Sequence, residues 1–171
     1  PGSDLVVSFS SIGHDAGRAP SPEFVGTATG RGTSRQRRAL FVMDESRSWA
    51  NTPDFGPALQ EAVAKVTAAA PVARLGTIGL SMGAFSALVA AQLVPVDVVL
   101  AFGPQFTVAP GRMPDESRWR DWTARLPPVQ WPTAPLPERG WACLFHGLID
   151  DRAQAMARSE EHTSELQSLA Y

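Results

Sequence analysis

The stretch Leu75-Gly76-Thr77-Ile78-Gly79-Leu80-Ser81-Met82-Gly83-Ala84 decides the fold of this 171-residue chain. It begins as a short apolar run typical of a buried strand and turns at Ser81. It then continues, over residues 82–93, as small apolar residues typical of a helix packed against a sheet. The turn carries the pattern Gly-x-Ser-x-Gly. We therefore predict a strand, a tight turn and a buried helix in immediate succession.

A serine between two glycines on such a turn has a specific physical meaning. Strand and helix approach closely around it, and Gly79, Gly83 and Ala84 supply the room that larger side chains would fill. The turn lifts the Ser81 hydroxyl clear of the sheet, and the start of the helix leaves unpaired N–H groups beside it. We predict that Ser81 is a nucleophile and that the backbone N–H of Met82 faces a developing oxyanion. A packing turn without chemistry is the alternative.

The rest of the chain alternates between strand-like and helix-like segments. Short apolar runs that suit strands buried on both faces occur at residues 5–9, 39–43, 75–78, 96–102 and 141–145. Helical patterns occupy residues 57–70, which begin near a favourable proline and stop at Pro71, and residues 82–93. This alternation predicts an α/β domain with a mostly parallel sheet flanked by helices and right-handed crossovers.

Two segments interrupt the alternation. Residues 11–37 are rich in Gly, Ser, Thr and Arg, and predict a long loop with at most one helical turn at residues 22–27. Residues 103–140 contain eight prolines and predict a cap-like excursion over the carboxyl edge of the sheet, where such segments often cover a ligand site. The spacing of Trp119 and Trp122 predicts a short amphipathic helix there. A sugar-stacking role for Trp119 is the alternative.

Composition narrows the classes of function. The 15 basic and 17 acidic residues give a net charge of −2, which argues against a nucleic-acid binder, and no apolar run is long enough to span a membrane. The single cysteine, Cys143, excludes an internal disulfide framework, and its apolar surroundings predict a small buried side chain. A lone cysteine also favours a reducing, cytoplasmic compartment. No cofactor or metal is expected, and the oligomeric state stays open.

Over residues 4–157 the chain resembles the α/β-hydrolase superfamily, in which Gly-x-Ser-x-Gly holds the nucleophile. The resemblance implies a second oxyanion N–H from the loop after an earlier strand, here Ser10 or Ser11, although an ordinary turn is the alternative. It also implies a triad acid in the His-Gly-x-x-Asp stretch that ends at Asp150, with Asp151 as the fallback if the turn is shifted by one residue. Paired aspartates after a strand are also common helix caps.

A narrower resemblance concerns Arg47-Ser48-Trp49, Phe102-Gly103-Pro104-Gln105 and Arg118-Trp119. Together with the Ser-Met-Gly turn, these stretches look like bacterial hydrolase-fold proteins linked to capsule or surface-polysaccharide genes. The resemblance implies an ester or acyl substrate attached to a glycan. Asp44, at the end of the second strand, is a candidate to bind substrate with Trp119, and a loop-capping aspartate is the alternative.

The end of the chain departs from the family pattern. Residues 158–168 resemble the in-frame translation of a common sequencing-library adapter. We therefore expect the natural sequence to stop near Ala157, with residues 158–171 a non-native tail and residues 1–157 a partial hydrolase domain whose final strand is missing. Such a fragment is expected to show little turnover and marginal stability, because a lost strand leaves an unpaired sheet edge.

The catalytic histidine follows the acid in the family's chain order. Only His162 follows Asp150, and it lies within the expected tail, so we exclude it and expect the histidine beyond the truncation. His146, at a strand end, and His14, in the early loop, are alternatives. The leading hypothesis is a serine esterase acting through an acyl-enzyme. An acyltransferase on the same scaffold and a non-catalytic binding or accessory module are the competing hypotheses.

Overall fold

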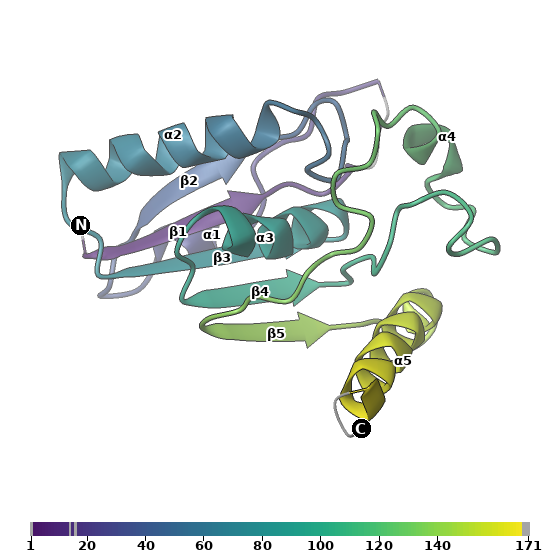
Figure 1. Ribbon diagram of the computed structural model, residues 1–171. Coiled ribbons are helices and arrows are strands. Elements are labelled where there is room, and N and C mark those ends of the chain that lie inside the picture. The colour runs from purple at the N-terminus through teal and green to yellow at the C-terminus, as the bar shows by residue number, and fades with distance from the viewer. Residues whose placement is uncertain (1, 14, 16, 169–171) are drawn as a thin grey trace.

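The computed structural model describes residues 2–13, 15 and 17–168, with side chains described up to residue 160. At its centre is a five-stranded, all-parallel sheet with the order β2-β1-β3-β4-β5 (Figure 1). The strands are β1 (Asp4–Phe9), β2 (Arg38–Val42), β3 (Arg74–Leu80), β4 (Val98–Phe102) and β5 (Trp141–Phe145). Because all of them are parallel, their carboxyl ends share one edge of the sheet. The predicted α/β class with a parallel sheet is confirmed.

Helices lie on both faces of this sheet. They are α1 (Val25–Thr29), α2 (Phe55–Ala69), α3 (Met82–Leu93), α4 (Arg120–Thr123) and α5 (Arg152–Ser168). Helix α2 lies on the face of β1 that carries Phe9, whose ring centroid is 6.1 Å from that of Phe55. On the other face, the Ser8 hydroxyl donates to the carbonyl oxygen of Glu23, just before α1. Successive side chains of β1 point to opposite faces of the sheet, so Phe9 faces the layer with α2 and Ser8 faces the layer with α1.

Helix α3 is the most deeply buried element. Every residue from Met82 to Ala90 is buried, and the Thr77 hydroxyl of β3 donates to the carbonyl oxygen of Ala87. The prediction of a helix at residues 82–93 packed against the sheet is confirmed. Helix α2 begins two residues before the predicted start at residue 57, because Phe55 belongs to its buried face.

The expectation that every strand is buried on both faces is wrong at the edge strand β5. Ala142 and Leu144 pack on the core, whereas Trp141, Cys143 and Phe145 point to the opposite face and are exposed. Cys143 is therefore not the small buried residue that its apolar neighbours predict. Apolar content alone could not reveal the edge position, because that depends on which strand ends the sheet.

The excursion over residues 103–140 contains the short helix α4 and otherwise irregular backbone, as predicted. The part that contains α4 lies beyond the carboxyl ends of the strands, and the rest of the excursion runs back to the start of β5 (Figure 1). Arg47, buried in the loop after β2, ties this region together. Its guanidinium donates to the carbonyl oxygens of Ile12 and Arg18 in the loop after β1, and it lies 4.6 Å from the centre of the Trp122 ring.

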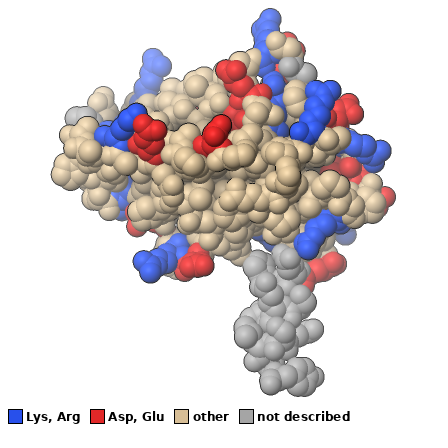
Figure 2. All heavy atoms as spheres, turned by 45° about the horizontal axis from the view of Figure 1, so that its top comes forward, with Lys and Arg blue, Asp and Glu red and all other residues tan. Residues whose placement is uncertain are grey.

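Charged groups are dispersed over the surface. Figure 2 shows basic and acidic side chains interspersed among uncharged ones on the face that it presents. Among the described residues, no helix combines the length and the apolar character that crossing a bilayer requires.

The close approach of α3 to β1 gives a direct test of this packing. A Cβ atom added at Gly83 would lie 2.3 Å from the carbonyl oxygen of Phe9, which is backbone and cannot rotate away. We expect Gly83→Ala to lower the free energy of unfolding by about 3 kcal/mol, measured by urea denaturation.

The matched control is Gly26→Ala in α1, where an added Cβ meets nothing within 4 Å. There the higher helix propensity of alanine should leave stability unchanged or raise it by up to about 1 kcal/mol. Equal effects of the two substitutions would contradict the packing described above.

Candidate active site

Ser81 stands on a strained turn between β3 and α3. Its φ of 54° and ψ of −119° lie outside the regions that L-residues ordinarily occupy. Neighbours without side chains make this turn sterically feasible, since a Cβ at Gly79 would lie 2.2 Å from the carbonyl oxygen of Gly83. The tight turn expected from the two glycines is present. Ser81 itself is only half-buried, so its hydroxyl is accessible at the carboxyl edge of the sheet.

The ends of three neighbouring strands assemble the site. The Ser81 N–H donates to the carbonyl oxygen of Phe102 at 2.8 Å, and the Gly103 N–H donates to that of Phe145 at 2.6 Å. Ser81, Gly103 and His146 therefore follow adjacent strands in the order β3, β4 and β5. Each step across the sheet spans about 4.8 Å.

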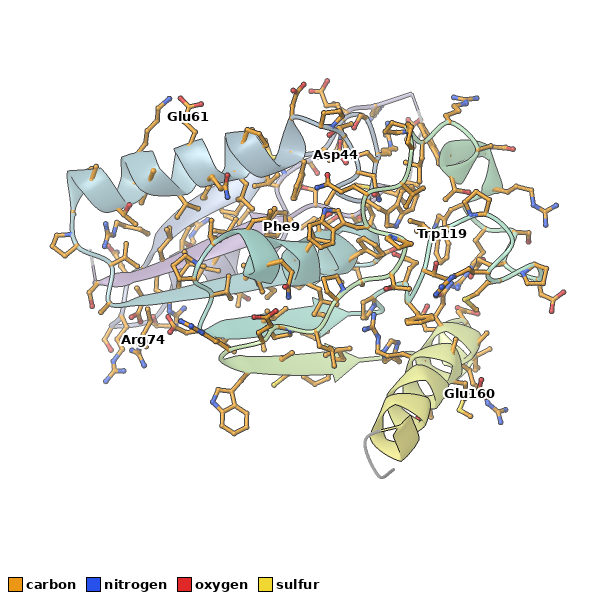
Figure 3. All side chains as sticks on the ribbon, viewed as in Figure 1. Phe9, Asp44, Glu61, Arg74, Trp119 and Glu160 are labelled. Carbon is orange, nitrogen blue, oxygen red and sulfur yellow. The ribbon has the colours of Figure 1, made fainter. Side chains whose placement is uncertain are left out.

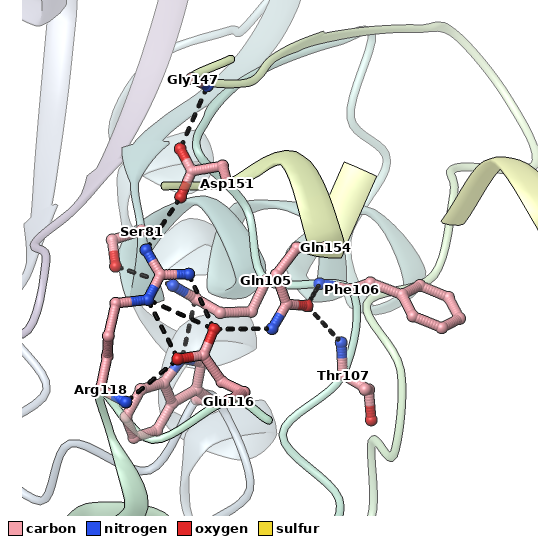
Figure 4. A network of polar contacts seen from close by, with 10 residues as sticks. Ser81, Gln105, Phe106, Thr107, Glu116, Arg118, Gly147, Asp151 and Gln154 are labelled. Carbon is pink, nitrogen blue, oxygen red and sulfur yellow. Dashed lines mark hydrogen bonds and ion pairs between the residues drawn. The ribbon is translucent and has the colours of Figure 1, made fainter. Parts of the chain in front are cut away.

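Gln105 is a site residue to which the sequence analysis assigned no role. Its Nε2 donates to the Ser81 Oγ at 2.9 Å (Figure 4). Its Oε1 accepts a hydrogen bond from the Trp49 Nε1 at 3.0 Å. Gln105 is 1% exposed and Trp49 is 0% exposed. Both residues lie in the stretches on which the narrower resemblance rests, and this was the signal in the sequence that could have pointed to them. Their contact could not be foreseen, because 56 positions separate them.

The loop after β1 lies directly beside the turn. The carbonyl oxygen of Ser10 is 2.8 Å from the position of a Cβ at Gly83. The Ser10 N–H already donates to the carbonyl oxygen of Val42 at 3.0 Å, so Ser10 is the poorer of the two predicted oxyanion donors. The Ser11 hydroxyl donates to the Glu23 carboxylate and accepts from the Gly13 N–H, which orders this loop. Ser11 therefore remains the candidate for a second backbone donor.

Met82 occupies the first position of α3, as predicted. Ala84 and Phe85 both donate their N–H groups to the carbonyl oxygen of Ser81, which closes the first turn. The Met82 N–H precedes these and has no acceptor within the helix, because the residue four positions earlier is in β3. Its amide and the positive end of the helix dipole thus lie next to the Ser81 side chain.

Of the two aspartates after β5, Asp151 rather than Asp150 faces the strand ends. One Asp151 carboxylate oxygen accepts from the Gly147 N–H at 3.2 Å and lies 2.9 Å from the position of a Cβ at Gly103. The other accepts from Arg118 at 3.3 Å. Asp150 is exposed and lines a surface cleft next to Arg118. Of the two candidate acids, the fallback Asp151 is therefore the one that lies at the strand ends, and its role as an acid stays a prediction.

A network of charged and polar groups extends from Asp151 into the excursion (Figure 4). Arg118 pairs with the Glu116 carboxylate at 2.7 Å, and Glu116 also accepts from Gln154. Burial would raise the pKa of Glu116, but the hydrogen bonds from Arg118 and Gln154 outweigh burial and lower it. This network holds the Arg118 guanidinium between the side chains of Glu116 and Asp151.

The two predicted substrate-binding residues have different surroundings. Figure 3 shows Asp44 and Trp119 toward the carboxyl ends of the strands, with Arg74 at the opposite edge. The Asp44 carboxylate accepts from the backbone N–H groups and hydroxyls of Ser46 and Ser48, so it caps its own loop, and the expected substrate contact is not supported.

Trp119 is half-buried and borders a mostly apolar cavity of about 240 Å³ together with Val108, Met113 and Glu116. One of its ring faces carries the Arg118 guanidinium, 4.1 Å from the ring centre. The cavity lies within the excursion, and its lining does not include Ser81.

A histidine base is not in contact with the serine among the side chains that the structure describes. His146 directly follows β5, two strands from the strand that precedes Ser81, and its buried Nδ1 has no hydrogen-bond partner among the described residues. Burial lowers the pKa of His146, and the charge of Arg158 lowers it further, against a smaller opposite effect of Asp151. His14 and the side chain of His162 lie outside the described part of the chain.

The described residues contain no group of three or more His, Cys, Asp or Glu side chains placed to hold a metal ion. No protein-family model matches the chain, and no curated protein is significantly similar to it.

The environment of His146 predicts a pH dependence of stability. Its pKa is lower in the folded than in the unfolded chain, so unfolding takes up a proton at mildly acidic pH. The stability that neutral His146 contributes to the folded state is fully present above the ordinary histidine pKa of about 6.5. It is lost as the pH falls through the lower pKa of the folded state. We expect the urea-unfolding free energy to drop between about pH 7.5 and about pH 5, and to drop less in His146→Gln. An identical drop in both proteins would exclude this assignment.

Proposed function

We propose that this protein is a serine hydrolase of the α/β-hydrolase type that cleaves an ester through an acyl-enzyme on Ser81. The observation that carries the proposal is the conformation of Ser81, which is strained and half-exposed and stands at the start of a buried helix. A backbone conformation this costly persists only where the surroundings enforce it, and such strain clusters at functional sites. The geometry is that of a serine held out from the edge of a sheet.

The proposed reaction is an acyl transfer in two steps. The Ser81 Oγ attacks the ester carbonyl carbon and its proton passes to a general base, so that a new C–O bond forms while the carbonyl oxygen becomes an oxyanion. The base then protonates the departing alcohol as the old C–O bond breaks. Water, deprotonated by the same base, attacks the acyl-enzyme and releases the acid and Ser81. The N–H groups of Met82 and Ser11 are the proposed oxyanion donors.

Asp151 is the proposed acid of the triad. Its carboxylate is fixed by the Gly147 N–H and by Arg118 at the edge where Ser81 is exposed. In this role it would orient a histidine and stabilise its protonated form. We propose that this histidine comes from outside the side chains that the structure describes, in keeping with the order serine, acid, histidine.

For the substrate, we propose an ester with an apolar portion that occupies the cavity beside Trp119. Its lining is mostly apolar, and an aromatic side chain that is half-exposed at such a wall can also pack against a sugar ring. This fits the glycan-linked ester implied by the family resemblance.

A second candidate is a non-catalytic binding module on the same fold. One observation favours it: Ser81 hydrogen-bonds to Gln105 and not to a described histidine, and a serine without a proton acceptor is a weak nucleophile. An acyltransferase would use the same serine and differ only in the acceptor of the second step.

Labelling by a fluorophosphonate probe separates these candidates. The probe reacts with an activated serine by forming a P–O bond to Oγ and releasing fluoride. In protein that contains the proposed histidine, we expect one equivalent to be attached, located at Ser81 by peptide mass spectrometry, and no attachment in Ser81→Ala. The matched control is Ser117→Ala, at an exposed serine in the cleft beside Arg118, which should be labelled as the parent is.

A folded protein that stays unlabelled would favour the binding module. Equal labelling of the parent and of Ser81→Ala would remove Ser81 from the mechanism.

A further inference from the structure

Gln105 connects the serine to a fully buried indole. The amide nitrogen reaches the Ser81 Oγ and the amide oxygen reaches the Trp49 Nε1, at 2.9 Å and 3.0 Å respectively. Both Gln105 and Trp49 are almost completely buried. Buried polar groups need their partners, so each of these two contacts constrains how the amide is turned.

The indole determines the orientation of this amide. An indole N–H can only donate, so the Gln105 oxygen has to face Trp49. The Gln105 –NH2 group therefore has to face Ser81, and the Ser81 Oγ accepts this hydrogen bond. Because the Oγ accepts from Gln105, its own O–H remains free to donate to a base.

The loop that carries Trp49 is built at a conformational cost. Arg47, Trp49 and Ala50 all adopt left-handed φ values, of 49°, 51° and 60°, which residues with bulky side chains rarely do. Asn51 secures the loop by donating to the carbonyl oxygen of Trp49 at 2.9 Å, and Asp44 caps its start. A loop that keeps this backbone strain indicates that the position of the Trp49 indole has a role in addition to core packing.

Gln105 is also held from its backbone. The Phe106 N–H, on the peptide unit that follows Gln105, donates to the Gln154 Oε1 at 2.7 Å. With its amide fixed at one end and its backbone at the other, Gln105 presents a preorganised donor to a single atom. Such donors are most effective where charge develops during a reaction.

We propose that Gln105 is a catalytic residue that stabilises negative charge on the Ser81 Oγ, and that Trp49 is the positioning residue that turns its amide toward that atom. The charge arises twice in the proposed reaction. It develops as the hydroxyl proton passes to the base during attack, and again when the Oγ leaves the acyl carbon during deacylation. The catalytic part of this inference rests on the proposed function, whereas the donation to the Oγ can be measured without any substrate.

The test replaces the hydroxyl by a thiol, whose ionisation is measurable. In a Cys143→Ser background, Ser81→Cys places one thiol at the turn, and the pH dependence of its alkylation by iodoacetamide gives its pKa. Removing the donor in Gln105→Met, which keeps the side-chain length, should raise this pKa by about 1. Trp49→Phe removes the partner of the amide oxygen and part of the buried ring, and it should raise the pKa less, because the amide nitrogen can still reach the thiolate.

Gln92→Met is the matched control. It makes the same change at a half-buried glutamine near the end of α3, far along the helix from Ser81, whose amide donates to the carbonyl oxygen of Leu136 at 2.9 Å, so the thiol pKa should not change. Gln105→Glu provides a second, isosteric variant that can keep the bond from Trp49, and its carboxylate should raise the pKa at least as much as Gln105→Met does. Thermal unfolding of each variant establishes that the alkylation reports on folded protein.

An unchanged thiol pKa in both Gln105 variants, or an equal rise in Gln92→Met, would overturn the proposal. With Ser81 intact, Gln105→Met should also slow fluorophosphonate labelling about tenfold, the loss expected for a hydrogen bond to a charged oxygen. If Ser81 resists the probe in the parent while the thiol pKa still depends on Gln105, the donor role stands and the esterase proposal fails.

Discussion

The close approach of three backbones around Gly79 and Gly83 is the constraint on which the rest of the structure depends. Strand β3, the start of α3 and the end of β1 come within van der Waals contact there, and side chains at the two glycines would collide with carbonyl oxygens. This contact buries α3 against the sheet. The same lack of side chains leaves room for the unusual conformation of Ser81, so core packing and site geometry depend on one steric condition.

Polar contacts of three loops then complete the site. The loop after β1 lies against the turn, the loop after β2 supplies Trp49, and the segment after β4 supplies Gln105. Each loop is ordered by its own hydrogen bonds, as Asp44 illustrates by capping Ser46 and Ser48. A polar residue at the carboxyl edge of the sheet can therefore serve to order a loop. Its hydrogen-bond partners show whether it has this structural role or is free to take part in chemistry.

Local sequence patterns predicted much of this structure. Most of the features that they did not predict depend on contacts between residues far apart in the chain. The turn at Ser81 and the buried helix after it were predictable, because glycine spacing and apolar content are local properties. Cys143 was misjudged because the exposure of an edge strand depends on sheet order. Gln105 was missed because its partners are distant in the chain. Asp150 and Asp151 could not be separated, because the choice depends on how the backbone enters α5.

The contacts of Arg47 limit which substitutions this protein can accept. A single guanidinium joins the loop after β1, which borders the proposed oxyanion site, to Trp122 in the excursion that shapes the cavity wall. Remodelling that wall for a new ligand would disturb the loop beside Ser81 through the same side chain. Substitutions in the loop after β1 and in the excursion should therefore be accepted in pairs more readily than singly. Libraries that vary both segments together are the better route to altered selectivity.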